Sequence, residues 1–126
     1  MGYDLEIIPV RVPAGTVFPV EKAAATTILE QATPMDAQRV RGALLATKGC
    51  KPGPGDAVDY VGQGLSYARM TVTERAVHLD NNAGPRDLEA ICQSLEAALG
   101  PVVIRDLQSG RLHTPESYRQ WLSRPL

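Results

Sequence analysis

Apolar and polar residues alternate with a period of two in several short segments of the chain, a pattern typical of half-buried β-strands. In residues 3–8, Leu5 and Ile7 would face the core. The same alternation, or a short apolar run, predicts further strands at residues 66–72, 75–80 and 101–105. Residues 57–61 could add another short strand, whereas the Gly- and Pro-rich residues 49–56 predict a loop.

The strands at residues 66–72 and 75–80 are predicted to form a hairpin around Thr73-Glu74. A two-residue turn there sets a register that pairs apolar residues with apolar residues and polar residues with polar residues. The pairs are Met70 with Val77, Ala68 with Leu79, Arg69 with His78 and Tyr67 with Asp80. Thr-Glu is not a favoured two-residue turn, and a longer loop would shift the pairing.

A helical period marks four other segments. The clearest is residues 85–99, which carry apolar residues at helical spacing between Gly84-Pro85 and Gly100-Pro101. Residues 19–32 predict a first helix. A second is expected to begin with Thr33 as N-cap and to end before Gly49. Thr114-Pro115 opens a short last helix, which would anchor itself through Tyr118, Trp121 and Leu122.

The resulting order, β-α-α-β-β-α-β-α, predicts a single α+β domain over residues 1–126. We expect an antiparallel or mixed sheet of about four strands with helices packed on one face, a ferredoxin-like arrangement or a variant of it.

Charge and composition narrow the classes of partner. The 126 residues include 13 basic and 14 acidic side chains without a basic cluster, so we expect no nucleic-acid binding. No apolar run approaches the roughly 18 residues of a membrane span, and the N-terminus lacks a signal-peptide pattern. We therefore expect a cytoplasmic protein with no membrane partner. Cys50 and Cys92 are expected to be free thiols.

The hairpin places four polar residues, Tyr67, Arg69, His78 and Asp80, on the face away from Met70 and Val77. Asp4, Glu6 and Arg105 could join them from flanking strands. Such a group could be a binding or active face, or simply the solvated side of an antiparallel sheet. Arg69 opposite His78 would disfavour the imidazolium that a general base must form, although Asp80 could compensate.

Other reactive patterns are weaker. Cys92 lies on the apolar stripe of residues 85–99 and is expected in the core. Lys48 and Lys51 flank Cys50 and would lower its thiol pKa, but no neighbouring base is evident. Metal-ligand and phosphate-loop spacings do not occur, so we expect no metal, no cofactor and no catalytic residue of these kinds. We expect Tyr118 and Trp121 to dock the last helix onto the core.

The opening Gly2-Tyr3-Asp4-Leu5-Glu6-Ile7 and the run from Pro101 to Arg111 resemble a loose set of small uncharacterised bacterial proteins. Some of these are similar to immunity proteins, which neutralise toxins delivered between competing bacteria. The resemblance implies an exposed face complementary to a toxin, and no catalytic residues.

Two functional hypotheses follow. The first is a non-enzymatic cytoplasmic protein-binding domain of bacterial type, whose partner is a toxin or a second copy of the chain. The alternative is a small enzyme that acts on a compact anionic substrate through Tyr67, Arg69, His78 and Asp80. The enzyme hypothesis requires a pocket over these side chains.

Overall fold

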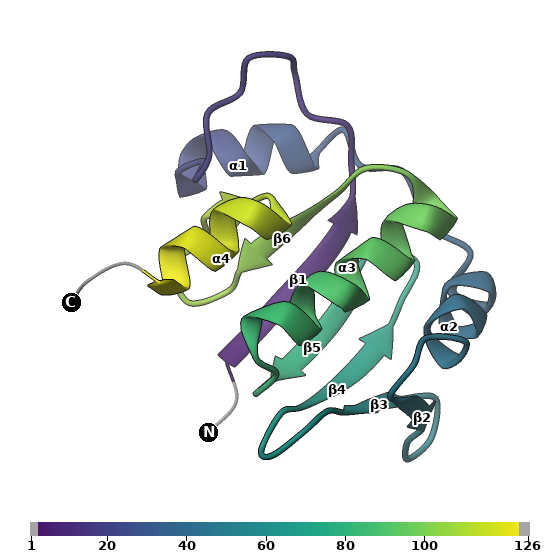
Figure 1. The fold of residues 1–126 in the computed structure, drawn as a ribbon. Coiled ribbons are helices and arrows are strands. Elements are labelled where there is room, and N and C mark those ends of the chain that lie inside the picture. The colour runs from purple at the N-terminus through teal and green to yellow at the C-terminus, as the bar shows by residue number, and fades with distance from the viewer. Residues whose placement is uncertain (1–2, 124–126) are drawn as a thin grey trace.

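A single antiparallel sheet with four helices makes up the part of the chain that the computed structural model describes, residues 3–123 (Figure 1). Its seven strands follow the order β2-β3-β4-β5-β1-β6-β7. Their bounds are β1 (Tyr3–Pro9), β2 (Cys50–Pro52), β3 (Val58–Val61), β4 (Tyr67–Val72), β5 (Val77–Asn81), β6 (Val102–Asp106) and β7 (Leu112–His113). The middle strand is β5, and its neighbour β1 is also an inner strand, which pairs with β5 on one side and β6 on the other.

The α+β class is confirmed, but the prediction of about four strands is wrong. Besides the predicted segments, β3 is a full member of the sheet, and β2 and β7 form its two edges. β2 lies within residues 49–56, which we expected to be a loop. Pro52 is compatible with an edge strand, because an edge residue does not need its N–H for pairing on the outer side.

The helices are α1 (Lys22–Leu29), α2 (Ala37–Leu45), α3 (Pro85–Leu99) and α4 (Pro115–Ser123). α3 has the predicted bounds, and the predicted last helix is also present. α1 and α2 are shorter than expected. α2 begins after Asp36, whose carboxylate Oδ1 accepts hydrogen bonds from the N–H groups of Gln38 and Arg39 at 3.1 and 3.2 Å. Thr33 is therefore not the N-cap.

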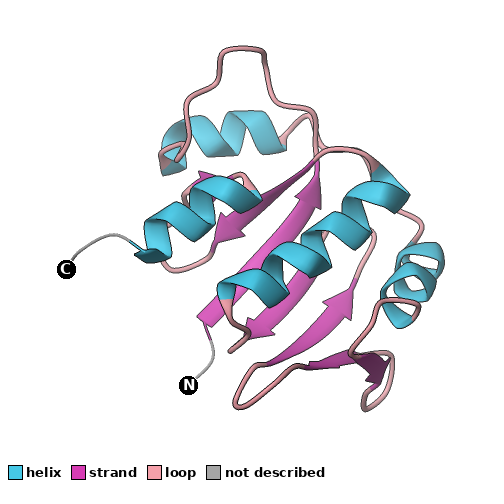
Figure 2. Cartoon of the chain, viewed as in Figure 1, coloured by secondary structure: helices cyan, strands magenta, loops and turns pink. Residues whose placement is uncertain are grey.

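The helices cover both faces of the sheet, which corrects the prediction of one covered face. α2, α3 and α4 cover the first face, and α3 and α4 cross in front of the strands in Figure 2. On this side lies the larger core, which includes Leu5, Ile7, Val40, Met70, Leu79, Ile91, Leu95 and Ile104. α1 packs on the opposite face, where Ala25 joins Ile8, Val103 and Leu112. The physical reason is that β1 and β6 carry consecutive apolar residues, so both sides of these strands are buried.

The β4–β5 hairpin has a longer turn than the predicted one. Its register pairs Met70 with Leu79 and Thr71 with His78, two residues away from the predicted pairing. Thr73 organises the turn, since its Oγ1 accepts hydrogen bonds from the N–H groups of Arg75 and Ala76 at 3.2 and 3.3 Å. Because the shift is an even number of residues, every side chain keeps its predicted face.

Candidate functional site

The polar side of the sheet, away from α2, α3 and α4, carries two cross-strand rows of hydrophilic residues beside α1. We call this surface the open face. One row runs Asp59, Arg69, Asp80 and Asp4 across β3, β4, β5 and β1. The neighbouring row runs Thr71, His78, Glu6 and Arg105 across β4, β5, β1 and β6.

The structure brings the four predicted residues together on the open face. Tyr67 and Arg69 come from β4, and His78 and Asp80 from β5. Arg69 lies directly opposite Asp80, whereas the predicted partners of both were different. The flanking residues Asp4, Glu6 and Arg105 also lie on this face, as the alternation in β1 and β6 suggested.

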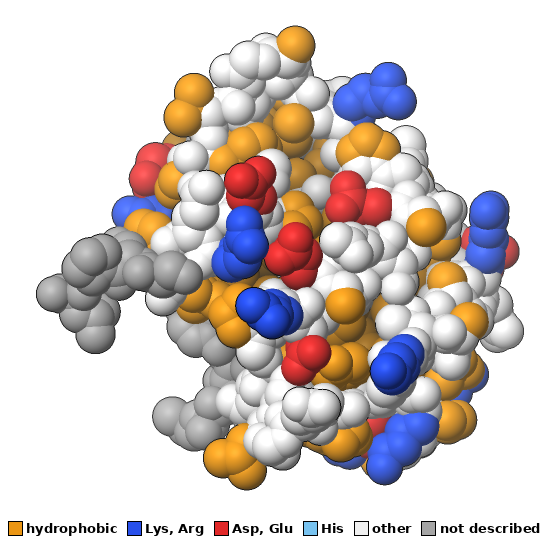
Figure 3. All heavy atoms as spheres, in the orientation of Figure 1, with side chains coloured by type: hydrophobic (Ala, Val, Ile, Leu, Met, Phe, Trp, Pro, Cys, Tyr) orange, Lys and Arg blue, Asp and Glu red, His pale blue; other side chains and the backbone are white. Residues whose placement is uncertain are grey.

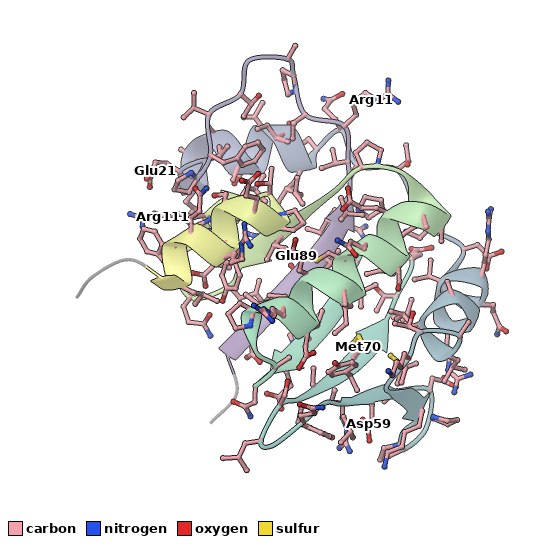
Figure 4. All side chains as sticks on the ribbon, in the orientation of Figure 1. Arg11, Glu21, Asp59, Met70, Glu89 and Arg111 are labelled. Carbon is pink, nitrogen blue, oxygen red and sulfur yellow. The ribbon has the colours of Figure 1, made fainter. Side chains whose placement is uncertain are left out.

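Arg69 is held by a carboxylate that the sequence reasoning missed. Its Nε donates to Asp59 Oδ1 at 2.8 Å and its Nη2 to Asp59 Oδ2 at 3.0 Å. These hydrogen bonds hold the pKa of the Asp59 carboxyl below its usual range. Asp59 is labelled in Figure 4 and its side chain is 10% exposed. The alternation of residues 57–61 was the one signal that could have placed it on this face.

His78 lies in a different environment from the predicted one. Its Nε2 is 3.8 Å from Asp4 Oδ1, and its cross-strand neighbours are Thr71 and Glu6. The cation that we expected opposite the imidazole is therefore not there. Asp4 and Asp80 face each other across β1 and β5, so two carboxylates lie together beside His78 and form the acidic side of the open face.

A pocket on this side of the sheet lies next to the four residues rather than over them. This pocket of about 380 Å³ includes Glu6 and Arg105 in its lining, together with residues from α1 and the β4–β5 turn. Tyr67, Arg69, His78 and Asp80 do not line it. The pocket that the enzyme hypothesis requires over these four side chains is therefore not the one that the structure shows.

A second polar network joins the β3–β4 loop to the start of α3. Asp87 accepts a hydrogen bond from the Ser66 hydroxyl, and Ser66 Oγ accepts one from the Gly84 N–H at 3.1 Å. The hydrogen bonds from Ser66 and then Tyr60 lower the pKa of Asp87. Burial, together with Asp87, raises the pKa of Tyr60 to about 12. This network keeps Tyr60 protonated and fastens the loop to the helix.

Neither cysteine has the environment of a nucleophile. Burial raises the pKa of the Cys92 thiol to about 12, in agreement with its predicted place in the core. Burial also raises the pKa of Cys50, so the expected lowering by Lys48 and Lys51 is wrong. Both are free thiols.

The last helix docks on the core as expected through Tyr118, which is buried, but Leu122 is exposed and is not an anchor. Beside α4, Arg111 Nε donates to Glu21 Oε2 at 3.2 Å (Figure 4). The Arg111 guanidinium lies 4.9 Å from the centroid of the Trp121 ring. Acidic and basic side chains are interleaved over α3 and α4 (Figure 3), where Glu89 and Arg119 approach to 4.0 Å.

Two general features of residues 3–123 bear on the classes of function. No helix in this range is long and apolar enough to cross a bilayer. Nor does the range contain a group of three or more His, Cys, Asp or Glu side chains arranged to hold a metal ion.

No known protein family, curated protein or solved structure matches the chain significantly.

Proposed function

We propose that this protein is a non-enzymatic, cytoplasmic protein-binding domain of bacterial type and that the open face is its binding surface. The most concrete form of this proposal is neutralisation of a toxin, as the sequence resemblance implies. The observation that carries it is the pairing of interface-type anchors, Tyr67 and Arg69, with exposed apolar residues at one corner of a charged sheet face.

The anchor corner lies at the β3–β4 end of the open face. Tyr67 is opposite Val61, which is 45% exposed, and the loop between these residues carries Leu65, which is 95% exposed. Aromatic and arginine side chains dominate the binding energy of many interfaces, with polar groups forming the rim around them. The corner has both kinds of anchor, two positions apart on the same face of β4.

Preorganisation favours the same surface. The two hydrogen bonds that Arg69 donates to Asp59 fix its guanidinium before any partner arrives. An arginine that is already ordered loses less conformational entropy on binding than a freely moving one. Its side chain remains 44% exposed, so it can still contact a partner.

Charge indicates what the partner should present. Asp4 and Asp80 lie opposite each other on the acidic side of the face. Like charges in such positions repel each other, and a cationic group of a partner would relieve the repulsion. We therefore propose a protein partner that places an apolar patch on the anchor corner and a basic side chain between Asp4 and Asp80.

The test is affinity capture of the tagged protein from lysate of its own source cells, with mass spectrometry of what is bound. We compare the wild type with Asp80→Lys on the open face and Glu96→Lys on the exposed side of α3, a matched charge reversal. The proposal predicts a stoichiometric partner protein that the wild type and Glu96→Lys retain and Asp80→Lys loses. Capture that survives Asp80→Lys and is lost in Glu96→Lys contradicts it, and so does an empty capture.

A further inference from the structure

The pocket beside α1 is a second site with its own chemistry. It lies where the C-terminal part of α1 and the following loop meet the sheet, and its volume is about 380 Å³. Small-molecule sites span roughly 300–1,000 Å³, so a small metabolite is the appropriate size of ligand. The residues that matter for recognition are Glu6, Ile8 and Arg105 on the sheet, Leu29 and Ala32 beside them, and Ala76 in the turn.

Arg105 is paired less closely than Arg69, because its ion pair with Glu6 is long and makes no hydrogen bond. Its Nε is buried without a hydrogen bond, and its Nη1 comes no closer than 3.7 Å to Glu6 Oε1. Within residues 3–123 its side chain makes no hydrogen bond. Leaving the buried Nε–H donor of the guanidinium without an acceptor is unfavourable. Because the side chain is 33% exposed, an acceptor in the pocket can reach it. A carboxylate is the group that best matches this planar donor set.

The pocket also favours a cation. Glu6 and Glu74 contribute carboxylates to its lining, and Arg75 and Arg105 contribute cations, so the formal charges cancel. The C-terminal end of α1 adds partial negative charge beside Leu29. A ligand with only a negative charge would be opposed by these acidic groups. A ligand that carries both charges would match them.

The rest of the lining is apolar. Ile8, Leu29, Ala32, Pro34 and Ala76 surround the charged groups. We propose that the pocket binds a small zwitterion with an apolar body, a free apolar α-amino acid or a short peptide of such residues. Its carboxylate contacts Arg105, its ammonium group contacts Glu6, and its side chain packs against Ile8 and Ala76. This inference goes beyond the protein-binding function and uses another part of the open face than the anchor corner.

The pocket is already formed in the free protein. The Met35 N–H donates to the Glu74 carbonyl at 2.7 Å, which ties the segment between α1 and α2 to the β4–β5 turn. Thr73 fixes the turn itself through its hydroxyl. A preformed site needs little ordering on binding, so a small ligand can be held by few contacts.

The experiment is a titration of the isotope-labelled protein followed by amide chemical shifts. The probes are leucine, 4-methylpentanoate (no ammonium group), 3-methylbutylamine (no carboxylate), glycine (no apolar side chain) and the dipeptide Leu-Leu. We expect leucine or Leu-Leu at millimolar concentration to shift the amides of Ile8, Ala32 and Ala76, and the other three probes to bind more weakly. Whichever of leucine and Leu-Leu binds more strongly shows whether the ligand is a free amino acid or a peptide.

Variants assign the charged contacts. Arg105→Gln and Glu6→Gln should each weaken binding by about tenfold or more. Arg105→Lys keeps the charge without the planar donor set, so its affinity should be intermediate. It replaces Arg105→Gln in the test if that variant does not fold. Arg111→Gln, which removes an arginine paired elsewhere with Glu21, should bind like the wild type. Absence of shifts with leucine and Leu-Leu, equal binding of 4-methylpentanoate, or full binding by Arg105→Gln and Arg105→Lys would overturn the proposal.

Discussion

His113 is a buried histidine that is stable in its neutral form. Its Nδ1 is 3.0 Å from Ser117 Oγ, and its ring packs edge-on against Tyr118 with centroids 5.3 Å apart. Its Nε2 is buried without a hydrogen-bond partner in the described structure. Burial lowers the pKa of His113, although nearby Asp106 opposes the shift. Protonation in the folded state would therefore place a poorly solvated charge between β7 and α4.

This environment predicts that acid destabilises the protein through His113. An unfolded histidine has a pKa of about 6.5, above that of the folded residue, so below this pH the unfolded state binds the extra proton. The stabilisation is complete above that range and is lost as the pH falls. Urea unfolding between about pH 7 and pH 5 should show this loss in the wild type and a smaller loss in His113→Phe.

The other histidine is the control for this prediction. His78→Gln leaves His113 in place and should lose stability with falling pH as the wild type does. A His113→Phe profile that parallels the wild type would show that other groups cause the acid sensitivity.

Single residues were predictable where their role is local. Leu88, Ile91 and Cys92 are buried as the helical stripe indicated. The Asp59–Arg69 contact was not predictable, because it depends on a strand pairing and on Gly53. A Cβ at Gly53 would lie 2.8 Å from Asp59 Oδ1. Gly62 lies similarly close to Asp87, because a Cβ at Gly62 would lie 2.6 Å from Asp87 Oδ2. These glycines looked like loop residues, and their partners are distant in sequence.

Helix ends show how local signals compete. α3 was predictable because Gly84-Pro85 and Gly100 agree with the apolar stripe between them. At α2, Thr33-Pro34 and Asp36 offered two starting points. The structure uses Asp36, while Met35 turns into the core and its N–H bonds to the Glu74 carbonyl. A long-range contact therefore decides the start of this helix.

The two candidate caps predict different stability effects. Asp36→Ala removes the acceptor of two N–H hydrogen bonds and should reduce the free energy of unfolding by about 1 kcal/mol. Thr33→Ala, at an exposed position outside the helix, should change it much less. Urea denaturation of both variants measures the difference. A larger effect of Thr33→Ala would contradict the observed start of α2.

The edge strands had little signal of their own. β2 has three residues and β7 has two, too few to establish an alternating pattern. Their neighbours hold them, since β2 pairs with β3 and β7 pairs with β6. Such strands follow from the completed sheet rather than from local sequence preference. The estimate of about four strands therefore fell short at the edges.

At the scale of the whole molecule, the two faces of the sheet have different roles. α2, α3 and α4 cover the larger core on one side, and α1 covers part of the other. The uncovered remainder is the open face, with Tyr67 and Arg69 near one corner and the zwitterion pocket beside α1. The sequence identified the polar composition of this face. It could not identify the cross-strand rows or the pocket, because both depend on the final strand order.

We propose that the protein binds its partner through the open face. The most direct test is the affinity of the purified protein for its captured partner, measured by calorimetry. We compare the wild type with Tyr67→Ala on the open face and with Leu122→Ala, an exposed apolar residue of α4. We expect Tyr67→Ala to weaken binding by about tenfold or more and Leu122→Ala to leave it unchanged. Normal binding by Tyr67→Ala together with loss of binding by Leu122→Ala would place the interface on the helical side of the sheet instead of the open face.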